Sequence, residues 1–225
     1  LLYFIPIVGF ILYLIIGQDY HKYKMFKAKE IEGELKYAVR RQEETIYHRQ
    51  LKMTSPALNR FRDLVLYNLE AGQAVLTDNN DIRIYTDGKE KFHALIEEMK
   101  RAKKYIHVQY YIIRNDEVWQ DIEKVLIEKA HEGVEVRVLF DSMGCRTMHK
   151  RDWDRLKREG IRVAEFFPAI LGQLQMRVNY RNHRKIVVID GKVGFVGGFN
   201  VGREYIGKDE KFGYWRDTHL CIEGA

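Results

Sequence analysis

Two side chains that can act together on a phosphodiester stand two residues apart in the segment 179–200. His183 and Lys185 precede Asp190 in the spacing H-x-K-x-x-x-x-D. Because side chains alternate along a strand, His183 and Lys185 are predicted to point to the same face. A neutral imidazole can attack phosphorus while the ammonium neutralises a phosphoryl oxygen, which gives a covalent intermediate without a metal.

Two glycines and an asparagine follow these three residues, at Gly197, Gly198 and Asn200. Glycines let the backbone come close to a ligand, and an asparagine amide can donate to a phosphate oxygen. We therefore predict that these three residues contribute to binding a substrate phosphate.

A hairpin is predicted to carry this set. Two runs rich in β-branched residues, 185–189 and 192–196, flank the dipeptide Asp190-Gly191. An Asp-Gly pair between such runs is the strongest short-range hairpin signal. Such a turn favours aspartate for backbone reasons of its own, so a structural role for Asp190 stays open beside a catalytic one.

A nucleophilic imidazole also needs an acceptor that fixes its second ring nitrogen. Asp217, within a predicted strand GYWRDTHLCIEG, is a candidate, and a surface aspartate paired with Arg216 or Lys211 is the alternative. Asp141, at the end of the predicted strand 134–140, either binds a ligand or caps the next segment. His107 and Tyr110 are predicted to be core or supporting residues.

Strand and helix patterns alternate through residues 79–225. Strand patterns at 81–86, 105–113, 134–140 and 161–167 are separated by apolar residues at helical spacing, and Gly133 and Gly160 end two of these helices. This order predicts an α/β layered domain with a mixed, largely parallel sheet flanked by helices, in which the hairpin adds local antiparallel pairing.

The first residues predict an attachment to the membrane. Residues 1–17 include the apolar run LLYFIPIVGFILYLII, and basic side chains follow it at 21–29. We predict a truncated transmembrane helix with the following domain on the cytoplasmic side; a buried core helix is the alternative. Residues 18–78 are predicted to be a juxtamembrane helical region. The chain starts at Leu1 rather than Met, so it reads as a piece of a longer protein.

Composition narrows the partners without choosing among them. The chain of 225 residues has a formal net charge of +6, which suits lipid headgroups, nucleic acid or phosphate. Cys145 and Cys221 show no paired spacing and are expected to be reduced. The histidines lack metal-ligand spacing and the glycines lack the ending of a nucleotide-binding loop, so no metal or cofactor is predicted.

The full pattern, H-x-K-x-x-x-x-D, six residues and then G-G-x-N, resembles the signature of the phospholipase D superfamily. With YIHVQYYIIRND, GFVGGFNVGREYIGKD and FGYWRDTHLCIEG, the chain is similar to bacterial cardiolipin synthases. The resemblance implies a membrane-anchored phosphatidyltransferase that joins two phosphatidylglycerol molecules and releases glycerol. By this resemblance His183 is the nucleophile or its acid/base counterpart, Lys185 and Asn200 hold phosphate, Asp190 is catalytic, and Asp217 orients His183.

The chain departs from that family in carrying one signature where the family carries two. This difference predicts half an active site, which needs a missing C-terminal half or, in second place, a homodimer. Three rivals stay open: a lipid hydrolase, a nuclease and a non-catalytic membrane-bound scaffold. The predicted anchor and its affinity for anionic membrane lipids argue against a nucleic-acid substrate.

Overall fold

The computed structural model describes residues 5–10, 34–47, 59–72, 74–77, 79–166 and 181–224. The chain divides into two compact units. One comprises Gln18–Asn79, and the other comprises Asn80–Ala225 together with Leu1–Gly17. The signature residues all belong to the larger unit.

The smaller unit is built on two helices, α3 (Glu34–Tyr47) and α5 (Arg62–Gly72). Val39 of α3 and Leu69 of α5 are buried in one small apolar cluster. The side-chain amide of Gln42 exchanges two hydrogen bonds with the backbone of Leu76, at 2.8 and 2.7 Å. This amide therefore ties α3 to the segment that follows α5.

The predicted transmembrane helix at 1–17 falls mostly outside the described residues, of which 6–10 form a helical segment. Within the described ranges, no helix has both the length and the apolar character that crossing a bilayer requires.

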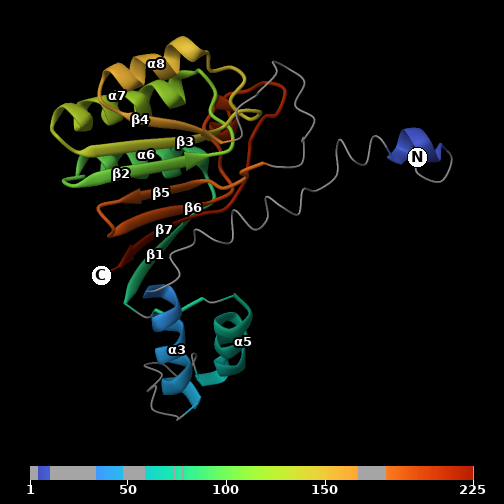
Figure 1. Cartoon of the computed structure of the whole chain (residues 1–225). Coiled ribbons are helices and arrows are strands. Elements are labelled where there is room, and N and C mark those ends of the chain that lie inside the picture. The colour runs from blue at the N-terminus through green and yellow to red at the C-terminus, as the bar shows by residue number, and fades with distance from the viewer. Residues whose placement is uncertain are drawn as a thin grey trace. The chain divides into compact units, whose positions relative to one another are not determined.

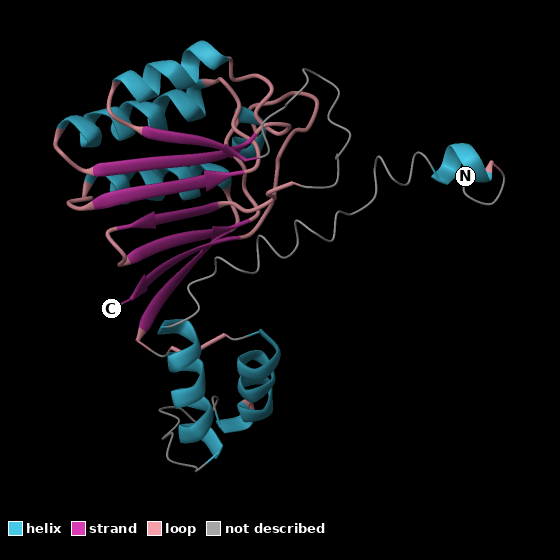
Figure 2. Ribbon diagram, in the orientation of Figure 1, coloured by secondary structure: helices cyan, strands magenta, loops and turns pink. Residues whose placement is uncertain are grey.

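The larger unit contains a seven-stranded sheet in the order β1-β7-β6-β5-β2-β3-β4 (Figure 1). Three helices pack on it, and the core lies between them and the strands (Figure 2). The strands are β1 (Asn80–Tyr85), β2 (Tyr105–Tyr110), β3 (Glu135–Asp141), β4 (Arg162–Phe166), β5 (Ile186–Ile189), β6 (Val193–Gly197) and β7 (His219–Gly224). The helices are α6 (Gly88–Lys100), α7 (Glu117–His131) and α8 (Lys150–Arg158), with a short 3-10 helix, η1 (Arg203–Ile206).

The predicted mixed sheet flanked by helices is confirmed, but the expectation that it is largely parallel is wrong. Only the β2–β3 and β3–β4 pairings are parallel among the described strands, and β5, β6, β7 and β1 join by antiparallel pairing. Parallel neighbours need a crossover, and α7 and α8 supply one each. A tight turn joins β5 to β6, and a returning loop that contains η1 joins β6 to β7, so these strands become antiparallel neighbours. The sheet is therefore mixed.

Local signals explain why the helices begin and end where they do. The Asp87 carboxylate accepts hydrogen bonds from the backbone N–H groups of Lys89 and Glu90, at 2.8 and 3.2 Å, and so caps α6. Gly133 and Gly160, with φ of 89° and 86°, follow α7 and α8 in the left-handed conformation that ends a helix. Both predicted glycine stops are confirmed.

The hairpin is also confirmed. Asp190 and Gly191 both have positive φ, at 55° and 72°, as the two central residues of a tight hairpin turn require. Pairing directions then bring one set of strand ends together. Strands β2, β3 and β6 finish, and β5 and β7 start, at the same end of the sheet, which we call the signature end.

Candidate active site

His183 and Lys185 meet at the signature end, just before β5 starts. The Lys185 Nζ lies 2.9 Å from His183 Nδ1 and 3.3 Å from His183 Nε2, and donates to the His183 carbonyl at 2.8 Å. The His183 side chain is exposed, whereas Lys185 is only 4% exposed. The predicted neighbourhood of the two side chains is confirmed, although both precede the strand rather than lie in it.

Charge and burial keep the imidazole neutral. Burial lowers the pKa of His183 from 6.5, the Lys185 ammonium lowers it further, and the Asp141 carboxylate partly opposes them. Burial lowers the pKa of Lys185 to about 8, against the attraction of Asp217. At neutral pH this geometry therefore offers an uncharged ring beside a cation, as nucleophilic attack on a phosphodiester requires.

Tyr111 supports both side chains. Its ring centroid lies 4.5 Å from that of His183, and the Lys185 Nζ lies 5.4 Å from the Tyr111 centroid. An ammonium over an aromatic face is stabilised by the ring quadrupole. Sequence reasoning missed this role, because Tyr111 follows the last residue of β2 and the alternating pattern there did not separate strand from loop.

Asp141 fixes the backbone next to His183. Its fully buried carboxylate accepts hydrogen bonds from Met143 and Gly144 within its own turn, at 2.9 and 3.3 Å. The other oxygen accepts from the Asn182 backbone N–H at 3.0 Å. The expectation that Asp141 caps the next segment is confirmed, and the bond to Asn182 gives it a second role beside the signature.

Asp217 lies against the glycines of the signature. A Cβ at Gly198 would fall 1.9 Å from the Asp217 Oδ1, and that oxygen accepts from the Thr218 backbone N–H at 2.7 Å. In the described part of the chain Asp217 makes no hydrogen bond to His183, and its charge acts on Lys185. Its predicted role in orienting His183 stays a prediction.

The structure indicates why positions 197 and 198 are glycine, and this reason differs from the predicted one. A Cβ at Gly197 would fall 2.4 Å from the His219 Cα and 2.4 Å from the Thr218 carbonyl oxygen. The two glycines therefore leave room for β7 and for the Asp217 carboxylate, and their predicted part in binding a substrate phosphate stays a prediction.

Asn200 is likewise engaged within the fold. It is 5% exposed, its Oδ1 accepts from the Ile112 backbone N–H at 3.1 Å, and its Nδ2 donates to the Tyr205 hydroxyl at 3.1 Å. These bonds fix the segment after β2 to η1. The predicted contact of Asn200 with a substrate phosphate stays a prediction.

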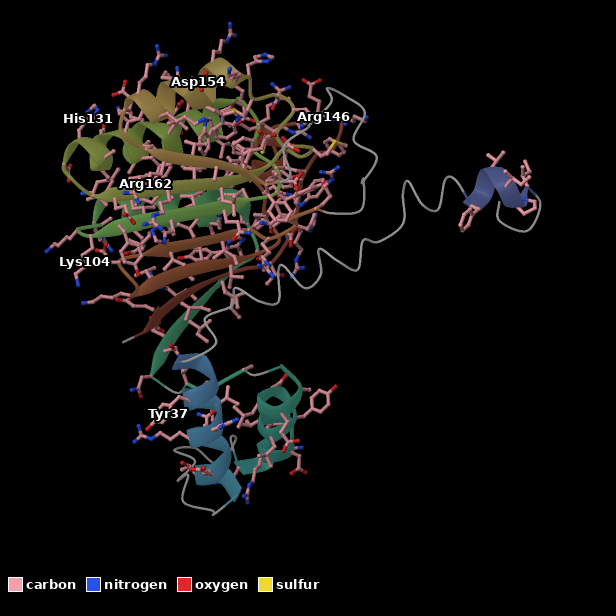
Figure 3. All side chains as sticks on the ribbon, viewed as in Figure 1. Tyr37, Lys104, His131, Arg146, Asp154 and Arg162 are labelled. Carbon is pink, nitrogen blue, oxygen red and sulfur yellow. The ribbon has the colours of Figure 1, made fainter. Side chains whose placement is uncertain are left out.

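Asp190 is not brought to the site. Its carboxylate accepts from the backbone N–H groups of Lys103, Lys104 and Tyr105, at 2.8, 2.7 and 2.9 Å, where β2 begins. Figure 3 shows Lys104 at the opposite end of the sheet from Arg146, which lies in the loop after β3. The structure therefore corrects the catalytic interpretation of Asp190 in favour of the structural one, because β5 separates it from His183.

Two buried polar side chains, Lys91 and His219, lie beneath the site, and neither was predicted to be there. Lys91 of α6 is fully buried and donates to the Tyr110 hydroxyl at 2.7 Å. His219 is also fully buried, and neither ring nitrogen has a partner among the described residues. Burial, with the charges of Lys91 and Lys185, lowers the pKa of His219 to about 2. His219 is thus a neutral ring, and its position between Gly197 and Phe199 makes it part of the support for the signature.

Comparison with known proteins places this geometry in a family. The family model described as "Cardiolipin synthase, PLD-like domain" matches residues 95–212. The chain is 46% identical to cardiolipin synthase 2 of Staphylococcus epidermidis over 224 residues, 99% of this chain and 46% of that protein. It is also 46% identical to cardiolipin synthase of Oceanobacillus iheyensis, over 99% of this chain and 47% of that protein.

Among solved structures, the chain is similar to NucT from Helicobacter pylori, at a TM-score of 0.49 and 16% identity, over 64% of this chain and 86% of that one. The chain spans about half the length of the curated relatives that it matches. The resemblance in the sequence is confirmed by the family match and by these relatives: the chain belongs to the cardiolipin synthase family of phospholipase D-like proteins.

Proposed function

We propose that the protein containing this chain transfers a phosphatidyl group from one phosphatidylglycerol to another, forming cardiolipin and releasing glycerol. One observation carries the proposal: the exposed His183 ring lies 2.9 Å from the Lys185 ammonium within a chain that is 46% identical to cardiolipin synthases. A neutral ring nitrogen beside a fixed cation is the arrangement that an in-line attack on a phosphodiester needs.

In the first step, a His183 ring nitrogen attacks phosphorus while Lys185 neutralises a non-bridging oxygen. The N–P bond forms, the bond from phosphorus to the headgroup glycerol breaks, and glycerol leaves with a proton from a general acid. In the second step, a hydroxyl of another phosphatidylglycerol attacks the phosphohistidine. The N–P bond breaks, a base takes the hydroxyl proton, and cardiolipin leaves.

The second acid/base group is proposed to come from a further signature outside this chain. The half of the relatives' length that this chain does not span is the first candidate for its location, and a second copy of the chain is the alternative. By itself the chain is expected to lack transferase activity.

The substrate also fixes the proposed location. Phosphatidylglycerol stays in the bilayer, so the site has to work at a membrane surface, and we place it on the cytoplasmic side through an N-terminal anchor. The basic residues after the apolar run at 1–16 favour this orientation. Anionic lipids are then both substrate and surface.

The test uses the full-length protein with phosphatidylglycerol vesicles and measures cardiolipin and glycerol. We expect His183→Ala to abolish both products. Mass spectrometry should detect an acid-labile phosphohistidine in the unaltered protein and not in this variant. His107→Ala is the matched control, because His107 is a partly exposed histidine whose ring pairs with Glu135, at 3.2 Å, rather than with His183 or Lys185. It should leave activity unchanged.

Three results would contradict the proposal. Phosphatidic acid as the main product indicates a hydrolase, because water then replaces the lipid hydroxyl as acceptor. Metal-independent cleavage of plasmid DNA that disappears in His183→Ala indicates a nuclease. Cardiolipin formation that survives His183→Ala removes the assigned nucleophile.

A further inference from the structure

We propose that residues 207–216, here called the aromatic loop, contact an anionic lipid bilayer directly beside the active site. The inference rests on the proposed function, since it places the surface from which the lipid would reach His183. It concerns the sheet and its loops within residues 80–225 and is independent of any N-terminal anchor.

The aromatic loop exposes two large rings to solvent. Phe212 is 53% and Tyr214 is 68% exposed. Trp215 lies behind them, with its ring centroid 5.7 Å from that of Phe212 and 5.1 Å from that of Tyr205. Exposed aromatic side chains are characteristic of the water–lipid interface, where an apolar ring with a polar atom is favoured. The three rings together therefore form a surface suited to the headgroup region of a bilayer.

The loop is held in shape by its own backbone. Gly207 and Gly213 have positive φ, at 68° and 61°, and so allow two sharp bends. The Gly213 N–H donates to the Asp209 carbonyl at 2.8 Å, and the Lys211 N–H donates to the Asp209 carboxylate at 3.0 Å. A loop fixed in this way presents its rings at little further cost in conformational entropy on binding.

The position of the loop links it to the chemistry. It belongs to the connection from β6 to β7, so it lies at the signature end of the sheet. Trp215 is two residues before Asp217, whose charge acts on Lys185. Lipid in contact with the aromatic loop would therefore lie at the same end of the sheet as the Lys185–His183 pair.

The charged side chains of the aromatic loop favour binding to an anionic membrane surface. Lys211 and Arg216 of this loop are exposed, and neither has a carboxylate partner among the residues that the structure describes. Glu210 is an exposed carboxylate in the same loop and offsets one of these charges. The net positive charge near the rings indicates phosphatidylglycerol-rich membranes over zwitterionic ones.

The experiment uses Trp215 as the probe, because the other tryptophans, Trp119 and Trp153, are 0% and 6% exposed in the core. The full-length protein is added to phosphatidylglycerol vesicles whose acyl chains carry bromine, which quenches nearby indoles. The fluorescence difference between the protein and its Trp215→Phe variant isolates the Trp215 signal. We expect this signal to be quenched in brominated vesicles, and less so when phosphatidylcholine replaces phosphatidylglycerol.

Paired variants test which side chains mediate the contact. Phe212→Ser with Tyr214→Ser should remove most of the Trp215 quenching. Ile82→Ser is the matched control: it removes a side chain that is 52% exposed on β1, where it pairs with Ile222 away from the signature end. It should leave the quenching unchanged.

Two results would overturn the inference: a Trp215 signal that brominated lipid does not quench, or quenching that the double variant retains in full. The His183→Ala variant separates the two proposals, because it should lose cardiolipin formation while keeping the quenching of Trp215.

Discussion

The Asp217 carboxylate packs against the Cα of Gly198. A Cβ at position 198 would fall 1.9 Å from the Asp217 Oδ1 and 2.4 Å from the Asp217 Cγ. No side chain fits between them, so the glycine of the signature sets the position of an acidic residue that lies far along the chain. Through Asp217 it also acts on Lys185, since the Asp217 charge opposes the fall in the Lys185 pKa. We therefore propose that the second glycine of G-G-x-N serves the chemistry indirectly.

Gly198→Ala is predicted to displace Asp217 and to reduce cardiolipin formation by about a hundredfold, because misplacing a group by about 1 Å can cost that much. The matched control is Gly194→Ala on β6, where a Cβ would meet nothing within 4 Å. Activity assays on both variants check the prediction. An active Gly198→Ala enzyme would show that the position of Asp217 does not matter.

The activity is predicted to have a bell-shaped dependence on pH. His183 has to be uncharged, so the acidic limb should lie below 6.5, where burial and Lys185 hold its pKa. Lys185 has to be charged, so activity should fall again as pH rises through about 8. Initial rates across this range, with substrate in excess, measure both limbs.

Lys185→Arg tests the assignment of the alkaline limb. A guanidinium stays protonated, so the limb near pH 8 should disappear, although the maximum rate should fall because the fork of arginine does not replace a point charge. An unchanged alkaline limb in this variant would assign that limb to another group.

The local part of the fold could be predicted from the sequence. Asp190-Gly191 between two apolar runs specifies a hairpin within a dozen residues, and Gly133 and Gly160 mark helix ends by conformation alone. The pairing of β1 with β7 joins the two ends of the larger unit, and no local pattern encodes it. Long-range pairings of this kind explain why most strand pairings in the mixed sheet are antiparallel, although the sequence pattern predicts mostly parallel ones.

The candidate site likewise has one part that could be predicted from the sequence and one part that could not. His183 and Lys185 are close in sequence, so their meeting followed from spacing, whereas the contact of Asp141 with Asn182 depends on how β3 and β5 flank β2. One missed residue did carry a signal. Lys91 precedes Phe92 and lies four residues before Leu95, on the face of α6 that is buried. A lysine on an apolar helix face is expected to be paired or functional.

Asp141→Asn is predicted to shift the acidic limb of the pH profile to lower pH. The substitution removes a negative charge that raises the pKa of His183, so the ring stays neutral down to a lower pH. It also leaves the Asn182 N–H with a poorer acceptor, and we expect a rate loss of about tenfold, from a cost of roughly 1–3 kcal/mol for an unsatisfied buried group.

An NMR titration of the His183 ring in the full-length protein measures the shift directly. Asp154→Asn is the control, because Asp154 is a carboxylate on the outer surface of α8 (Figure 3), near Lys157 at 3.8 Å. A lower rate with an unaltered His183 titration would limit Asp141 to holding the backbone.

Asp190→Ala is predicted to lower the free energy of unfolding while leaving the chemistry intact. Three backbone N–H groups at the start of β2 lose their acceptor, which we expect to cost about 1–3 kcal/mol. Asp190→Asn should cost less, since asparagine keeps one acceptor oxygen and tolerates the positive φ of 55°. Urea unfolding at neutral pH measures both variants, and cardiolipin formation is assayed at a temperature where each stays folded.

The pH dependence of this difference identifies its source. Burial opposes the charge on Asp190, but the backbone N–H groups of Tyr105, Lys103 and Lys104 outweigh it and hold the pKa below 3.8. A folded-state pKa below the unfolded value stabilises the fold above that unfolded value, and the contribution is lost as pH falls through the folded-state pKa. The gap between the protein and Asp190→Ala should therefore narrow below pH 3.8. Loss of activity without loss of stability would instead return Asp190 to the catalytic set.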